Sequence, residues 1–314
     1  MFLPVFLFLI GIVVLLLSAN EFVKQSILFS SKLRISPLII GTTIVAVGTS
    51  MPELVVTLIS ASKGDVGLGL GNIVGSNIVN VLLILGIAIV FGKIRVGTTK
   101  TQKNTLIMVG VTALFILLHM LKGPVISGAI LISAFLFFSI MEFYWGVDGR
   151  HHEDIVKIRN LAKKYKGVNL WLFVLALLGV IGGGFITVIQ AENISALLGL
   201  STTVFGLLAT ATATSMPELA VTIISQRKGQ EKMALGNIIG SNICNLGLIG
   251  GLLYLFHGQP DLGINAWVFL IGSTLLSFLI VTQFSGKVIP RWVGALLLIV
   301  LIGYFGMLIM TGTP

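Results

Sequence analysis

Two glutamates stand in near-identical motifs, each within an apolar stretch long enough to cross a membrane. Glu53 follows Pro52 in GTSMPELVVTLISASKG at 48–64, and Glu218 follows Pro217 in ATSMPELAVTIISQRKG at 213–229. Placing a carboxylate in hydrocarbon costs about 3 kcal/mol or more, so an acid at membrane depth indicates function. No Lys, Arg or His lies at comparable depth in either stretch. We therefore expect a cation from solution to neutralise the two carboxylates.

Small residues that offer oxygen atoms share a helix face with each glutamate. Ala46, Ser50 and Glu53 recur at the helical spacing i, i+4, i+7, with Thr49 beside them. The second motif repeats this face with Ala211, Thr214, Ser215 and Glu218. Carbonyl, hydroxyl and carboxylate oxygens are thus expected along one side of each helix.

The prolines of the two motifs predict a helix break just before each acid. Proline has no N–H to bond the carbonyl four residues earlier, so Pro52 frees the carbonyl of Gly48 and Pro217 frees that of Ala213. Irregular backbone at membrane depth is tolerated only where it is buried or lines a polar cavity. As one helix, 36–61 would measure about 39 Å, which exceeds the hydrocarbon core. A tilted or broken helix is therefore predicted.

A second polar stripe follows each acidic motif, in GNIVGSNIVN at 71–80 and GNIIGSNICN at 236–245. Residues four apart share a helix face. The glycines and two amides of each copy fit close helix packing, namely Gly71, Gly75, Asn72 and Asn77 with Gly236, Gly240, Asn237 and Asn242. The remaining polar residues are expected to be ligands: Ser76, Asn80, Ser241 and Asn245. An all-oxygen set suits a hard cation, and Ca²⁺ accepts its flexible geometry better than Mg²⁺ does.

The composition indicates a membrane protein. The chain has 314 residues, of which 56% are apolar and 10% charged, against about 25% charged in soluble domains. Ten stretches are long and apolar enough to span a bilayer: 3–18, 36–61, 67–91, 104–121, 124–145, 169–190, 201–226, 231–256, 265–284 and 290–311. The first is expected to be a span and not a signal peptide, because no basic residue precedes it. The single cysteine, Cys244, excludes an internal disulfide and any multi-thiolate metal site.

The net charge of +9 is explained by topology and not by nucleic-acid binding. Basic residues collect in alternate connectors: Lys93, Arg95, Lys100, Lys103, Arg150, Lys157, Arg159, Lys163, Lys164, Lys166, Arg227, Lys228, Lys232, Lys287 and Arg291. Lys24, Lys32 and Arg34 are expected at the start of the second span, which agrees with the same orientation. The opposite connectors hold only Lys63 and Lys122. The positive-inside rule then predicts a multi-pass protein of the cell membrane with both termini outside and the 146–168 linker cytoplasmic. His151 and His152 are expected to be solvated there.

The chain contains one sequence repeat used twice. A shift of 165 residues aligns 34–86 with 199–251 without a gap, and 27 of the 53 pairs are identical. A shared apolar composition does not explain why Pro, Glu, Asn and Ser recur at equivalent positions of the two copies. Each repeat contains five spans, and because five is odd the second copy enters the membrane from the opposite side. Transporters built from inverted repeats bind their substrate near the membrane midplane. We predict an all-α fold of ten transmembrane helices as two inverted five-helix repeats, with halves at 1–145 and 169–314.

At these motifs the sequence closely resembles the cation/calcium exchanger superfamily, particularly its prokaryotic-type sodium/calcium exchangers. The resemblance implies a ten-helix antiporter in which Na⁺ movement drives Ca²⁺ transport, without a cofactor. It implies a calcium site from Glu53 and Glu218 with the carbonyls of Thr49 and Thr214. It implies sodium sites that share these glutamates and add Ala46, Ser50 and Ser241 on one side and Ala211, Ser215 and Ser76 on the other. Asn80 and Asn245 would line the centre.

One departure from the family pattern concerns charge. Some members place Asp where Asn245 stands, which argues against the potassium-dependent branch and leaves the coupling stoichiometry open. A second, minor departure is Ala213, which stands at the position equivalent to Gly48 in the first repeat. The large regulatory domain of animal exchangers is absent, and the chain is expected to act as a monomer on small cations in the lipid bilayer.

Two other functions remain open at this point, and a third is not predicted. A proton-coupled antiporter for Ca²⁺ or another divalent cation could titrate the two glutamates, and a cation channel could use the same oxygens. Mn²⁺ and Sr²⁺ remain open as substrates. An intramembrane enzyme would need a nucleophile with a base, or His and Asp metal ligands. His119 and His257 lie near span ends without such partners, so no enzyme is predicted.

Overall fold

The computed structural model describes residues 2–33, 35–64, 66–97, 99–121, 123–148, 168–197, 211–256 and 262–311. Its first helices are α1 (Phe2–Leu33), α2 (Pro37–Ile40), α3 (Ala46–Thr49), α4 (Met51–Ser62), α5 (Val66–Val79), α6 (Gly86–Phe91), α7 (Thr99–Met120) and α8 (Pro124–Asp148). The others are α10 (Leu170–Leu197), α12 (Met216–Arg227), α13 (Glu231–Cys244), α14 (Gly250–Phe256), α15 (Ile264–Gln283) and α16 (Arg291–Thr311). Three π-helical segments join some of them: η1 (Gly41–Val45), η2 (Asn80–Leu85) and η3 (Asn245–Ile249).

The described part confirms an all-helical membrane protein. Eight helices are long and apolar enough to cross a bilayer, and the bent pair Pro37–Thr49 and Met51–Ser62 makes up to nine if its two segments form one span. Of the predicted stretch 201–226, residues 211–226 are described, and they are helical except at Ser215. The linker histidines, at 151 and 152, and His257 lie outside the described residues. The count of ten spans stays a prediction.

The first helix is much longer than predicted. The apolar run ends at 18, but α1 continues to Leu33, so assigning Lys24 and Lys32 to the start of the second span was wrong. Polar side chains bond to one another along this helix. Lys24 Nζ lies 3.0 Å from Glu21 Oε2, and Gln25 donates to Glu21 Oε1 at 2.6 Å. The length of the apolar run therefore underestimates the length of a helix whose polar side chains form hydrogen bonds and a salt bridge with one another.

The first motif helix is broken at the predicted place. Ser50 separates α3 from α4 with φ −81° and ψ 9°, and the two segments differ in direction by 41°. Ser215 has nearly the same backbone angles, φ −82° and ψ 5°, at the start of α12. The π-helical segments were not predicted, and two of them begin at candidate ligands, Asn80 and Asn245. Such wide turns are frequent at functional sites.

Glycines let α13 cross the first motif helix with the two backbones in contact. A Cβ added to Gly240 would lie 2.5 Å from the Thr42 Cα and 2.5 Å from its carbonyl oxygen. One added to Gly41 would lie 2.6 Å from the Met233 carbonyl oxygen. These short distances confirm the close packing predicted at the α13 glycines. The close crossing allows polar side chains of the two halves to form hydrogen bonds with one another.

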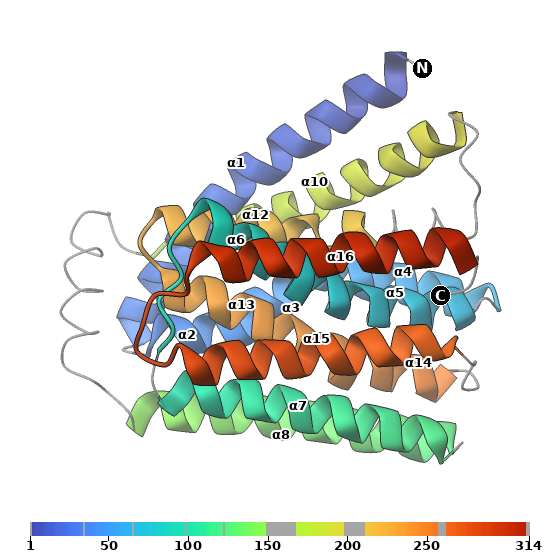
Figure 1. The fold of residues 1–314 in the computed structure, drawn as a ribbon. Coiled ribbons are helices and arrows are strands. Elements are labelled where there is room, and N and C mark those ends of the chain that lie inside the picture. Colours follow the sequence, from blue (N-terminus) through green and yellow to red (C-terminus); the bar gives the residue numbers. More distant parts are fainter. Residues whose placement is uncertain are drawn as a thin grey trace.

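The long helices α1 and α10 form a pair along one side of the bundle, while α7 and α8 lie side by side at the opposite side (Figure 1). Glycines join the first pair closely, since a Cβ on Gly183 would lie 2.6 Å from Leu15 N. A Cβ on Gly184 would lie 2.9 Å from Pro217 Cγ and 3.7 Å from Pro52 Cγ. The α1–α10 pair therefore passes directly over both helix breaks.

Candidate cation site at the two helix breaks

The structure brings the two glutamates together and bonds each to a serine of the other half. Ser50 Oγ donates to Glu218 Oε1 at 3.1 Å, and Ser215 Oγ donates to Glu53 Oε1 at 3.2 Å. Ser241 Oγ also donates to Glu218 Oε1, at 3.4 Å. Both glutamates are fully buried. Because the Ser50 and Ser215 bonds join one half to the other, the two breaks face one another across a single buried centre.

The threonines beside the breaks are also bonded across the halves. Thr49 Oγ1 lies 3.2 Å from Asn237 Oδ1, and Thr214 Oγ1 lies 3.3 Å from Asn72 Oδ1. Each asparagine then donates to the carbonyl oxygen of the glutamate in its own half, Asn237 to Glu218 and Asn72 to Glu53, both at 3.3 Å. This explains the packing role predicted for these two amides, because they fix the backbone on which each acid stands.

The serines and alanines of the predicted sodium sites lie in the same buried centre. Ser76 Oγ is 3.4 Å from Thr214 Oγ1, and Ser241 Oγ is 3.4 Å from Thr49 Oγ1. The Ala46 carbonyl oxygen accepts from Ser50 N at 3.0 Å and from Thr49 Oγ1 at 3.2 Å. The Ala211 carbonyl oxygen has equivalent partners. A cation at either carbonyl would therefore displace the threonine hydroxyl, which has an asparagine oxygen as its alternative acceptor.

Several polar atoms at this centre have no hydrogen-bond partner among the described residues. They are Glu53 Oε2, Glu218 Oε2, Asn77 Oδ1, Asn80 Oδ1, and Asn245 Oδ1 and Nδ2. Buried polar atoms are normally hydrogen-bonded, and an unpaired buried oxygen is costly. Five of these six atoms are acceptors, so the centre is suited to a ligand that accepts no hydrogen bond and carries positive charge.

The central asparagines break the symmetry of the repeats. Asn80 Nδ2 donates to Asn242 Oδ1 at 3.0 Å, whereas neither amide atom of Asn245 has a described partner. No basic residue compensates the acids: within the described residues the only salt bridge joins Lys24 to Glu21 on α1. The charge of the centre is therefore set by two carboxylates alone.

A third buried carboxylate was missed. Glu142 is 3% exposed on α8, and it accepts from Thr42 Oγ1 at 3.0 Å and from Asn104 Nδ2 at 3.1 Å. It lies near the end of the predicted span 124–145 and was not among the predicted site residues. A shift of 165 residues turns Glu142 into Met307 and Asn104 into Phe269. The comparison of the two repeats could therefore not reveal the cluster of Glu142, Thr42 and Asn104, which exists in the first half alone among the described residues.

The comparison with known proteins agrees with these motifs and this geometry. The sequence profile described as sodium/calcium exchanger protein matches residues 3–144 and 168–310. The chain belongs to this family. CaxA of Alkalimonas amylolytica, described as a candidate antiporter, is 32% identical over 313 residues, 94% of this exchanger and 95% of that protein. The sodium/calcium exchanger MaX1 of Methanosarcina acetivorans is 29% identical, again over 94% and 95%.

Solved structures show the same fold for the exchanger. The sodium-calcium exchanger NCX_Mj soaked with 2.5 mM Na⁺ and 0.1 mM Ca²⁺ superimposes with a TM-score of 0.78, at 28% identity and over 98% of both chains. The same protein soaked with 100 mM Na⁺ and 10 mM Sr²⁺ gives the same score, identity and coverage. The resemblance drawn from the repeated motifs is thereby confirmed, and the chain is a membrane transporter of the exchanger family.

Proposed function

We propose that this exchanger moves Na⁺ and Ca²⁺ in opposite directions through one site formed by both halves. One observation supports this most strongly. In each buried glutamate, one carboxylate oxygen accepts a hydrogen bond from a serine of the other half, and the second oxygen has no hydrogen-bond partner among the described residues. The two carboxylates, one from each half, therefore each keep one oxygen available to bind the same divalent cation.

For Ca²⁺ we propose the side chains of Glu53 and Glu218 with the backbone carbonyls of Thr49 and Thr214. Ca²⁺ takes six to eight oxygens in flexible geometry, and two carboxylates balance its charge. The bonds from Asn72 and Asn237 to the glutamate backbones support this assignment, because they hold the acids in place without occupying their free oxygens. Asn80 and Asn245 would supply further oxygens at the centre.

For Na⁺ we propose two sites, one on each side of the calcium site. The first would use Ala46, Ser50 and Ser241, and the second Ala211, Ser215 and Ser76, each with a glutamate oxygen. Hydroxyl and carbonyl oxygens in a buried cage favour a metal ion over a proton, which needs only one acceptor. The reciprocal serine–glutamate bonds support a site shared between the two ions and not separate pathways.

Charge gives a reason for obligatory exchange. The empty site carries about −2, and burying uncompensated charge costs several kcal/mol per ion. One Ca²⁺ brings the site to neutrality, and three Na⁺ would bring it to +1. Either loaded form crosses more readily than the empty one, so the cycle is antiport. A 3:1 cycle would move one net charge, worth about 2.3 kcal/mol per 100 mV.

For alternating access we propose ten spans in two inverted repeats, divided as 1–145 and 169–314, with α1 and α10 as the moving part. The tight glycine contacts between α1 and α10 support their movement as a pair, and Gly184 lies against both break prolines. The basic connectors support a cell-membrane location with the linker at 146–168 in the cytoplasm and both termini outside. We propose that the monomer is the working unit.

Transport by proteoliposomes tests the coupling. Vesicles containing the purified exchanger and loaded with Na⁺ should take up ⁴⁵Ca²⁺ on dilution into Na⁺-free buffer, while K⁺-loaded vesicles should not. Uptake driven by an imposed pH gradient and indifferent to Na⁺ would contradict sodium coupling and favour a proton antiporter. Flux that runs down the Ca²⁺ gradient without any counter-ion, with single-channel currents, would favour a channel.

A further inference from the structure

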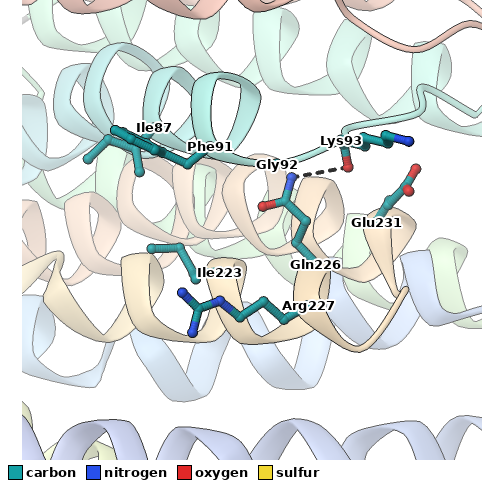
Figure 2. A pocket seen from close by; sticks show the side chains of 8 residues that line it. All are labelled: Ile87, Phe91, Gly92, Lys93, Ile223, Gln226, Arg227 and Glu231. Atoms are coloured by element: carbon teal, nitrogen blue, oxygen red, sulfur yellow. Dashed lines mark hydrogen bonds between the residues drawn. The ribbon is translucent and has the colours of Figure 1, made fainter.

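A cavity with basic and apolar walls lies between the end of α6 and the outer part of α12 (Figure 2). Its volume is about 430 Å³. It is lined by Ile87, Phe91, Gly92, Lys93, Ile223, Gln226, Arg227 and Glu231. None of these residues belongs to the cation site, and the ion exchange derived above uses none of them.

The cavity has a built polar floor. Gln226 Nε2 donates to the Ala88 carbonyl oxygen at 2.7 Å and to the Lys93 carbonyl oxygen at 3.0 Å, and the second bond is drawn in Figure 2. A Cβ on Gly92 would overlap the Gln226 amide, so only glycine lets this side chain lie across the end of α6. The first bond satisfies a carbonyl that the end of α6 leaves unpaired. The two bonds also hold α6 and α12 at a fixed separation around the cavity.

Two cations line this cavity without an ion pair. Lys93 and Arg227 are exposed, and neither belongs to a salt bridge within the described residues. The cavity's acid, Glu231, accepts the Arg95 backbone N–H at 2.8 Å, which partly compensates its charge. In Figure 2 the Arg227 guanidinium lies below Ile223, and the Lys93 ammonium lies at the opposite end beside Glu231. The lining residues carry two positive charges and one negative, a balance that suits an anion.

The apolar wall points to the kind of anion. Phe91 is 80% exposed at the end of α6, and with Ile87 and Ile223 it forms an apolar wall on the side of the cavity where the Arg227 guanidinium lies (Figure 2). The cavity lies where membrane-spanning helices end, among the connectors whose Lys and Arg residues predict the cytoplasmic side. Basic pockets between transmembrane helices on that side bind anionic lipid headgroups. A soluble anion would make no use of the exposed phenyl ring.

We propose that this cavity binds one anionic phospholipid, whose headgroup occupies the space between the ends that Lys93 and Arg227 mark and whose acyl chain lies against Phe91. The bound lipid would contact α12, the helix that carries Glu218 in its first turn. Lipid occupancy would therefore stabilise the docked position of α12 on α6. This inference does not depend on which ions the exchanger couples, because its test measures lipid binding and not transport.

The test uses the full-length exchanger in a neutral detergent, titrated with dioleoyl phosphatidylglycerol or dioleoyl phosphatidylcholine. Native mass spectrometry counts bound lipid, and thermal unfolding reports its effect on stability. One tight phosphatidylglycerol should bind and raise the melting temperature, while phosphatidylcholine and inorganic phosphate should not. The Lys93→Gln/Arg227→Gln double variant should weaken binding about thirty-fold. Lys93→Arg/Arg227→Lys should retain it, which separates charge from misfolding.

Lys287→Gln/Arg291→Gln is the matched control, because it removes two exposed positive charges from the same predicted side but outside the cavity. This control should bind phosphatidylglycerol as the unchanged protein does, whereas Phe91→Ser should weaken binding. Equal losses in the cavity and control variants would mean diffuse surface attraction and would overturn the proposal. Equal binding of phosphatidylcholine, or of inorganic phosphate alone, would overturn it as well.

Discussion

Gly240→Ala tests the helix crossing that holds the two halves of the site together. The new Cβ would lie 2.5 Å from the Cα and carbonyl oxygen of Thr42 and 2.7 Å from its carbonyl carbon. Ordinary contact begins at 3.4 Å, so α13 and η1 would have to separate by up to 0.9 Å, the difference between 3.4 and 2.5 Å. Overpacking of this kind costs about 1–3 kcal/mol. The upper end is expected because the obstructing atoms belong to backbone.

The same separation should reach the cation site. Thr49 Oγ1 lies 3.2 Å from Asn237 Oδ1 and 3.4 Å from Ser241 Oγ on α13, and both contacts are already long for hydrogen bonds. We expect Gly240→Ala to lower the melting temperature of the purified exchanger and to raise the Ca²⁺ concentration that gives half-maximal ⁴⁵Ca²⁺ uptake.

Gly303→Ala on α16 is the matched control, because nothing lies within 4 Å of the Cβ it would add. Alanine is the better helix former by about 1 kcal/mol, so this variant should be as stable as the unchanged protein or slightly more so. A Gly240→Ala protein that behaves like Gly303→Ala in both assays would refute the close crossing and its link to the site.

Three further predictions concern the residues around the breaks. Ser50→Ala and Ser215→Ala each remove one hydroxyl bond to the opposite carboxylate, and a bond to a charged group contributes about 1.5–3 kcal/mol. Each should raise the Na⁺ concentration for half-maximal ⁴⁵Ca²⁺ efflux by about ten-fold, and an effect in only one of them would contradict the reciprocal arrangement. Gly184→Ala should slow exchange while equilibrium Ca²⁺ binding stays within about two-fold, since its Cβ meets Pro217 at 2.9 Å; unchanged turnover would argue against movement of α10 over the breaks. Glu142→Ala should lower the unfolding temperature, because Asn104 loses its acceptor while Thr42 keeps the Ile39 carbonyl oxygen, and an unsatisfied buried group costs about 1–3 kcal/mol. Its repeat counterpart Met307→Leu should change stability less, and the reverse order would contradict a structural role for the Glu142 cluster.

The buried polar centre could be predicted from the sequence because its residue types are costly anywhere else in a membrane. Glu53, Glu218 and their serines stand out against an apolar background, and the 165-residue repeat shows that both copies keep them. The helix break was predictable for the same reason, since Pro52 removes a backbone donor whatever surrounds it. Local chemistry sufficed for these features.

What the sequence did not reveal depends on contacts that neither hydropathy nor the repeat comparison detects. Glu142 and Thr42 are 100 residues apart and meet only in the folded bundle, and no repeat copy draws attention to them. The extension of α1 past residue 18 depends on side chains such as Glu21 and Gln25 bonding along the helix, which a hydropathy window ignores. The π-helical segments that begin at Asn80 and Asn245 contain no proline that would distinguish them from ordinary α-helix.

Equilibrium ⁴⁵Ca²⁺ binding to the purified exchanger tests the central claim most directly, namely that the two break glutamates bind the ion together. Glu53→Gln and Glu218→Gln are compared with Glu142→Gln, which alters a buried carboxylate outside the site. The account predicts that both break variants lose high-affinity Ca²⁺ binding while Glu142→Gln keeps it, with all three proteins folded by thermal unfolding. Retained binding in either break variant, or an equal loss in Glu142→Gln, would contradict a shared site at the two breaks.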